Sequence, residues 1–121
     1  MYVLSPGCSD GLLQPPIGLT IRELRVDRMV VLELAGELDL ASAGAVRSAL
    51  ERAEADGPGL IVIDLRQLDF IDSAGIHVLV VAHQRIHHRG AARLELWPGG
   101  RAVQRVFALT GLDQVLPFAN R

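Results

Sequence analysis

The feature that most constrains the fold is the stretch of residues 59–76, in which an apolar run, a charged segment and a helical pattern follow one another. The run from Leu60 to Ile63 is continuously apolar, which is typical of a strand buried on both faces of a sheet. After the charged segment, the apolar residues recur at helical spacing from Ser73 onward. The order predicts a buried strand, a loop, and a helix that starts at Ser73.

Similar patterns lie on both sides of this stretch. Two alternating segments separated by a very short connection precede it and predict an antiparallel hairpin. Asp39 is placed to cap the next helix, because its carboxylate would accept from free amides of the first turn. The expected strands are residues 19–26, 29–35, 60–65 and 93–97, the expected helices are residues 40–55, 74–89 and 101–110, and residues 112–118 form an edge segment or a final turn.

The order β-β-α-β-α-β-α predicts an α/β fold. Single helices between strands imply parallel neighbours with right-handed crossovers, so we expect a mixed sheet of four to five strands with about three to four helices. The length of 121 residues predicts one domain. Proline and glycine are frequent in residues 1–18, which indicates a flexible N-terminal extension ahead of a domain over residues 19–121.

Composition narrows the possible partners. The net charge of −2 gives no field that would attract nucleic acid or an acidic membrane surface. No apolar run approaches the ~18 residues of a membrane span, and the N-terminus lacks the pattern of a signal peptide. Cys8 is the only cysteine, which excludes an internal disulfide. We therefore expect a cytoplasmic protein without a membrane or nucleic-acid partner.

Catalysis by Ser73 is disfavoured by its neighbours. The local sequence departs from the Gly-x-Ser-x-Gly motif of serine hydrolases, and Asp72 would oppose the oxyanion formed in acyl transfer. A metal site is also disfavoured, because His83 and His87 have the spacing of two ligands on one helix but no recognisable third ligand accompanies them. We expect neither an enzyme nor a protein that holds a metal or a cofactor.

Two uses of Ser73 remain open. Its hydroxyl could cap the helix, which would stabilise the protein by about 1 kcal/mol. It could instead accept a phosphate, because a helix N-terminus stabilises negative charge. Asp72, Asp69 and Asp39 would put that phosphate in acidic surroundings and make it hostile to a closely packed partner.

Four short motifs together resemble the bacterial anti-sigma factor antagonists, the stand-alone STAS domains. The combination of Gly-Glu-Leu-Asp with Asp-Ser-x-Gly at this separation is specific, and the resemblance covers roughly residues 19–118. The motifs are Gly36-Glu37-Leu38-Asp39-Leu40, Ile63-Asp64-Leu65, Leu68-Asp69-Phe70-Ile71-Asp72-Ser73-Ala74-Gly75-Ile76 and Thr110-Gly111-Leu112-Asp113.

The resemblance implies a STAS-like fold and a regulatory switch. The unphosphorylated antagonist is expected to bind an anti-sigma factor serine/threonine kinase and to release a sigma factor for transcription. The kinase, using ATP that it binds itself, would phosphorylate Ser73 and so end the interaction, and a phosphatase would restore it. The alternative is a STAS scaffold or signalling module that is not phosphorylated.

The same resemblance implies where the partner binds. The expected surface comprises the Ser73 loop, the first turns of the following helix and the loop after the second strand, presented by a monomer or weak dimer. Ala74 stands where the family often has a second hydroxyl, and Gly75 is expected to let a partner backbone approach closely. The predicted partner-binding residues are Gly36, Glu37, Asp39, Asp72, Ser73, Ala74, Gly75 and Ile76.

Overall fold

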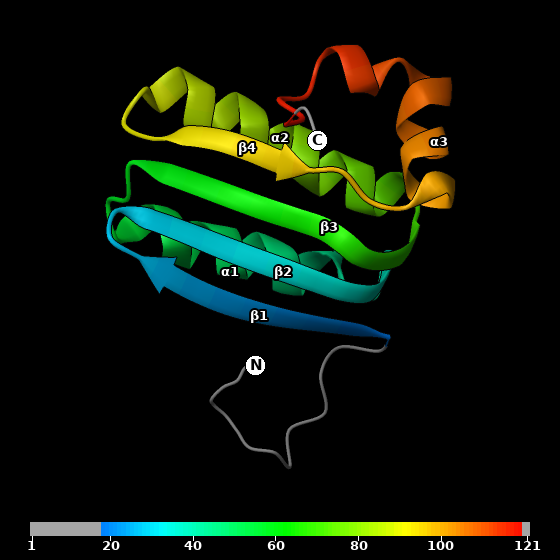
Figure 1. Ribbon diagram of the computed structural model, residues 1–121, viewed down its shortest axis with the longest axis horizontal. Helices are drawn as coiled ribbons and strands as arrows, with labels where there is room; N and C mark the ends of the chain where they lie inside the picture. The colour runs from blue at the N-terminus through cyan, green and yellow to red at the C-terminus, as the bar shows by residue number, and fades with distance from the viewer. Residues whose placement is uncertain (1–17, 120–121) are drawn as a thin grey trace.

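The computed structural model describes residues 18–119, which form a four-stranded sheet covered by helices (Figure 1). β1 pairs antiparallel with β2, and β3 pairs parallel with both β2 and β4. The predicted mixed α/β sheet with its opening hairpin is confirmed. In chain order the elements are β1 (Leu19–Val26), β2 (Met29–Leu38), α1 (Ala43–Ala55), β3 (Leu60–Ile71), α2 (Ser73–Arg89), β4 (Arg93–Trp97), α3 (Arg101–Thr110) and the 3-10 helix η1 (Leu112–Gln114).

The predicted N-terminal extension and Cys8 lie outside the described residues, except for Gly18. At the other end, the two alternatives for residues 112–118 both occur, because η1 is followed by a parallel bridge between Phe118 and Leu96 of β4. None of the helices within residues 18–119 is both long and apolar enough to cross a membrane.

The core lies between one face of the sheet and the helices α1 and α2, which run along that face (Figure 1). Alternate residues of the central strands point into it, as the period of two along a strand requires. The predicted apolar face of α1 is buried there, and α3 adds Val103 and Phe107. The buried core residues that β2, β3, α1 and α2 contribute include Leu32, Leu34, Ile61, Ile63, Val46, Ala49, Leu50, Ala53, Leu79 and Ile86.

Both central strands are longer than the sequence predicted. β2 continues to Leu38 and β3 to Ile71, and these two residues pair in register. The pairing of β2 and β3 contains register shifts between Glu33 and Ala35 and between Gly36 and Glu37. Such bulges break the alternation of apolar and polar residues, so the sequence pattern ends before the strand does.

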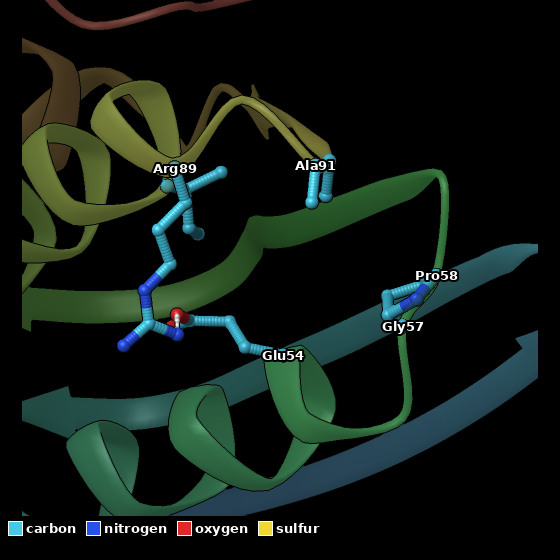
Figure 2. A pocket seen from close by; sticks show the side chains of 7 residues that line it. Glu54, Gly57, Pro58, Arg89 and Ala91 are labelled. Carbon is cyan, nitrogen blue, oxygen red and sulfur yellow. Dashed lines mark ion pairs between the residues drawn. The ribbon is translucent and has the colours of Figure 1, made fainter.

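The parallel strands define two ends of the molecule. The carboxyl ends of β2, β3 and β4 meet at one edge, which we call the carboxyl edge, and α2 begins there. At the opposite edge, α1 and α2 end beside a cavity of about 80 Å³. Figure 2 shows Arg89 of α2 extending toward Glu54 of α1 across this cavity. The cavity is far smaller than the ~300–1,000 Å³ of typical ligand pockets.

Glu54 also joins the two helices through Arg85. The Glu54 carboxylate accepts from Nε and Nη2 of Arg85 at 2.9 and 2.5 Å, and its side chain is only 6% exposed. These hydrogen bonds raise the pKa of the Arg85 guanidinium. Removing one partner of a forked, largely buried pair lowers the stability of the fold more than removing one partner of an exposed pair does.

Replacing Glu54 with glutamine is therefore expected to lower the free energy of unfolding by about 1–2 kcal/mol. The amide keeps the shape of the side chain but leaves the Arg85 charge uncompensated. Denaturant unfolding of the wild type, E54Q, R85Q and the double variant would measure the coupling. Glu37→Gln, which removes an exposed carboxylate at the carboxyl edge, far from Arg85, is the control. Additive effects of E54Q and R85Q would contradict the proposed pairing.

Candidate functional site

Two loops that are distant in sequence meet at the carboxyl edge. Leu38 at the end of β2 pairs with Ile71 at the end of β3, and the Asp72 amide donates to the Leu38 carbonyl at 3.1 Å. The segment from Gly36 to Asp39 therefore lies beside the start of α2. The predicted site residues all belong to the end of β2, to the loops that follow β2 and β3, or to the first turn of α2.

Asp72, and not Ser73, caps helix α2. Its carboxylate accepts from the amides of Ala74 and Gly75 at 2.9 and 3.1 Å, and its backbone is extended, as an N-cap requires. Ser73 is the first residue of the helix, and its side chain is exposed. The capping role considered for Ser73 was thus wrong, because the carboxylate one position earlier already satisfies the free amides.

Asp39 does not cap helix α1 either. Its carboxylate accepts from the amides of Ala41 and Ser42 at 3.0 and 3.2 Å, which closes a turn before the helix. As a result α1 begins at Ala43, later than predicted, with Ser42 at the N-cap position. The turn holds the Asp39 side chain at the carboxyl edge.

Ser42 is a site residue that the sequence reasoning missed. Its buried hydroxyl donates to the Glu37 carbonyl at 2.9 Å and accepts from the Asp39 amide at 3.0 Å. It ties the end of β2 to the start of α1 and so fixes the loop that carries Asp39. The spacing of three residues between Asp39 and Ser42, which resembles a capping box, was the available signal.

Two glycines allow the backbone to pack closely at this edge. Gly36 has φ of +109°, and a Cβ built there would lie 1.9 Å from the Gly18 carbonyl oxygen. Gly75 is buried, and its Cβ would lie 2.7 Å from Cγ of Leu38 and 2.9 Å from Cγ1 of Ile71. The missing side chain of Gly75 therefore serves contacts within the chain, and the close approach of a partner that the sequence suggested stays a prediction.

Two exposed apolar side chains lie at the same edge of the sheet as Ser73. Leu40 is 80% exposed and Phe70 is 48% exposed, whereas Ile76 and Ala74 are half-buried against the core. Leu40 ends one of the loops predicted to form the partner surface, but neither Leu40 nor Phe70 was singled out as a site residue. Both lay in quoted motifs, but a strand pattern does not reveal which apolar residues remain uncovered. An exposed apolar group of this kind is typical of a surface that binds another protein.

Four carboxylates share the carboxyl edge with this apolar surface. Glu37 and Asp69 are exposed, and Asp39 and Asp72 are partly buried by their own turns. Within residues 18–119, the Ser73 hydroxyl makes no hydrogen bond, and no three histidine, cysteine or acidic side chains are grouped so as to hold a metal ion. The edge thus presents an accessible hydroxyl on an acidic, partly apolar surface.

Comparison with known proteins identifies the family. The model of the STAS domain matches residues 21–121. The chain belongs to the STAS domain family. The anti-sigma-B factor antagonist of Listeria monocytogenes is 30% identical over 104 residues, which cover 86% of this chain and 90% of that protein. The resemblance to anti-sigma factor antagonists found in the sequence is thereby confirmed.

Solved STAS structures of the same kind share the fold. An anti-sigma factor antagonist from Mycobacterium paratuberculosis is 28% identical, covers 90% of this chain and 92% of its own, and superposes with a TM-score of 0.74. The antagonist SpoIIAA, a Bacillus protein described in its unphosphorylated form, is 27% identical, covers 84% and 90%, and has a TM-score of 0.68. The fold of this STAS domain is therefore that of known antagonists.

Proposed function

We propose that the protein is an anti-sigma factor antagonist whose binding is switched by phosphorylation of Ser73. In its unphosphorylated form it binds an anti-sigma factor that is a serine kinase, and a sigma factor is released for transcription in the cytoplasm. The kinase transfers the terminal phosphoryl group of ATP to the Ser73 oxygen, and the hydroxyl proton leaves with the formation of ADP. A phosphatase hydrolyses the phosphoserine and restores the binding form.

The main support for the proposal is that Asp72 caps α2 while Ser73 does not. Asp72 caps α2, so the hydroxyl of Ser73 has no structural duty and is exposed at the start of the helix. A kinase can reach such a hydroxyl without opening the fold. A phosphate on it does not compete for the capping bonds and lies near the positive end of the helix dipole.

The surroundings of Ser73 explain why the phosphate would end binding. A partner that covers Leu40, Phe70 and Ser73 would exclude water from the hydroxyl. A phosphoserine carries about −1.5 to −2 charges at neutral pH, and burying that charge in an interface is unfavourable without a matching cation. Glu37 and Asp39 share this edge, so the phosphate also adds to local negative charge of the protein itself. Steric exclusion and desolvation then act together against a closely packed complex.

SpoIIAA supports the proposal by its own description. It is an anti-sigma factor antagonist of the same fold, and the description of an unphosphorylated form refers to a second, phosphorylated state. The partner proposed here for this chain is a kinase of that regulatory system, recognised through the Ser73 loop and the segment from Gly36 to Leu40.

Phosphotransfer tests the proposal directly. We expect purified anti-sigma factor kinases from the same genome, given Mg²⁺ and ATP, to add one phosphate to the protein, with peptide masses that place it on Ser73. Ser73→Ala abolishes the transfer, whereas Ser48→Ala, which removes an exposed hydroxyl from α1, leaves it unchanged. Transfer to another residue, or binding of a kinase without any transfer, would favour the scaffold alternative over the switch.

A further inference from the structure

Ser73 heads a row of side chains on helix α2 that face α1. Residues four positions apart lie on the same side of a helix, so Ser73, His77, Val81 and Arg85 form one row. The last three of these line a groove between the two helices, which we call the α1–α2 groove. Its lining comprises Arg47, Leu50, His77, Val78, Val81 and Arg85. Ser73 is therefore the residue at which the row reaches the carboxyl edge.

The cations of the α1–α2 groove differ in their partners. Arg85 is held by Glu54 and also feels the charge of Glu51 on α1. Arg47 and His77 are both exposed, and neither makes an ion pair with any residue in the range 18–119. Arg47 lies in the second turn of α1 and His77 in the second turn of α2, so both are near the carboxyl edge.

We propose that Arg47 and His77 bind the phosphate of phosphorylated Ser73 on the surface of the protein itself. The inference rests on the proposed function, because it describes the phosphorylated state. His77 follows Ser73 by one helical turn, a spacing at which oppositely charged side chains interact. Arg47 faces the same groove from α1 and adds a permanent charge.

The acidic groups of the edge do not supply this contact. Asp72 and Asp39 are engaged by backbone amides and are repelled by a phosphate. The only cationic side chains that line the described groove near Ser73 are those of Arg47 and His77, since Arg85 is paired farther along the row. A phosphate held by them would project over the head of the α1–α2 groove and not freely into solvent.

The titration of the phosphate reports on these contacts. The second ionisation of phosphoserine occurs near pH 6. A cation beside the phosphate favours the dianion, so it lowers the pKa of the phosphoserine. Removing the cation raises that pKa.

Phosphorus NMR of protein with phosphoserine introduced at position 73 during translation tests the inference. We expect His77→Gln to raise the midpoint of the phosphate titration by roughly 0.3–0.7 pH units, and Arg47→Gln to raise it by a similar amount. In about 1 M salt the differences shrink, because the side chains are exposed. His88→Gln and Arg52→Gln, exposed residues at the far ends of the same helices, leave the midpoint unchanged.

Equal midpoints in the wild type, H77Q and R47Q would overturn the inference. A shift in H88Q or R52Q as large as in H77Q would also overturn it, since a general field of the protein would then explain the effect. Because the phosphoserine is introduced without a kinase, the result does not depend on whether Ser73 is the natural acceptor. Failure of the proposed phosphotransfer is seen only in the kinase experiment, so the two failures are distinguishable.

Discussion

Replacing Gly36 with alanine is expected to destabilise the domain by about 3–4 kcal/mol. A Cβ at this position would lie 1.9 Å from the Gly18 carbonyl oxygen, and φ of +109° is a conformation that alanine rarely adopts. The Gly18 carbonyl accepts from the Glu37 amide at 2.7 Å, so moving it away breaks this hydrogen bond at the end of the pairing between β1 and β2. Denaturant unfolding followed by circular dichroism would measure the loss.

Gly44→Ala is the matched control for this change. Gly44 lies inside α1, and a Cβ there would meet no atom within 4 Å. Alanine in a helix is favoured over glycine, so G44A should be stabilising by roughly 0.5–1 kcal/mol. A Gly36→Ala protein as stable as the wild type would show that the bulge of β2 relaxes freely, which contradicts the packing described above.

A negative charge at position 73 is expected to reduce affinity for the partner kinase about a hundredfold. Each tenfold loss corresponds to ~1.4 kcal/mol, and an uncompensated charge in a buried contact supplies at least twice that. Ser73→Asp mimics the charge, and an acidic residue in the first turn of a helix is stabilising. Lost binding would therefore not reflect unfolding. Titration calorimetry with the kinase would measure the change.

Ser48→Asp controls for charge alone. Ser48 is exposed on α1, away from the loops of the carboxyl edge, so the same charge there should change affinity less than threefold. If the kinase binds the wild type and S73D with comparable affinity, the charge on residue 73 does not end binding, even if Ser73 is phosphorylated. Equal losses in S73D and S48D would indicate that net charge, and not the Ser73 surface, controls binding.

The succession of periodic patterns was sufficient to predict the sheet and its helices. The alternation in residues 29–35, the continuous apolar run at Leu60 and the helical spacing after Ser73 are local properties, and local patterns report burial on one or two faces. The predictions were wrong where the local pattern does not follow the burial of the residues. The bulges of β2 interrupt the alternation, so the pattern hid the last residues of both central strands.

The candidate site was likewise predicted only in part from the sequence. The motifs around Asp39 and Ser73 predicted the two segments that meet at the carboxyl edge, and the resemblance predicted the family. The cap was assigned to the wrong residue, because Asp72 and Ser73 are both good N-cap residues and only the backbone conformation distinguishes them. Likewise, the sequence does not distinguish an exposed leucine from a buried one, so the exposure of the Leu40 side chain was not predicted.

By itself, the sequence determined the fold class, the family and the two motifs that carry the candidate site. The stretch of residues 59–76 could predict a strand followed by a helix because both depend on neighbouring residues. Only the tertiary structure showed that Asp72 caps α2 in place of Ser73 and that Gly75 packs against side chains of the same domain. It also showed that His77 and Arg47 line the same groove. These relations depend on contacts between elements far apart in sequence, which no local pattern records.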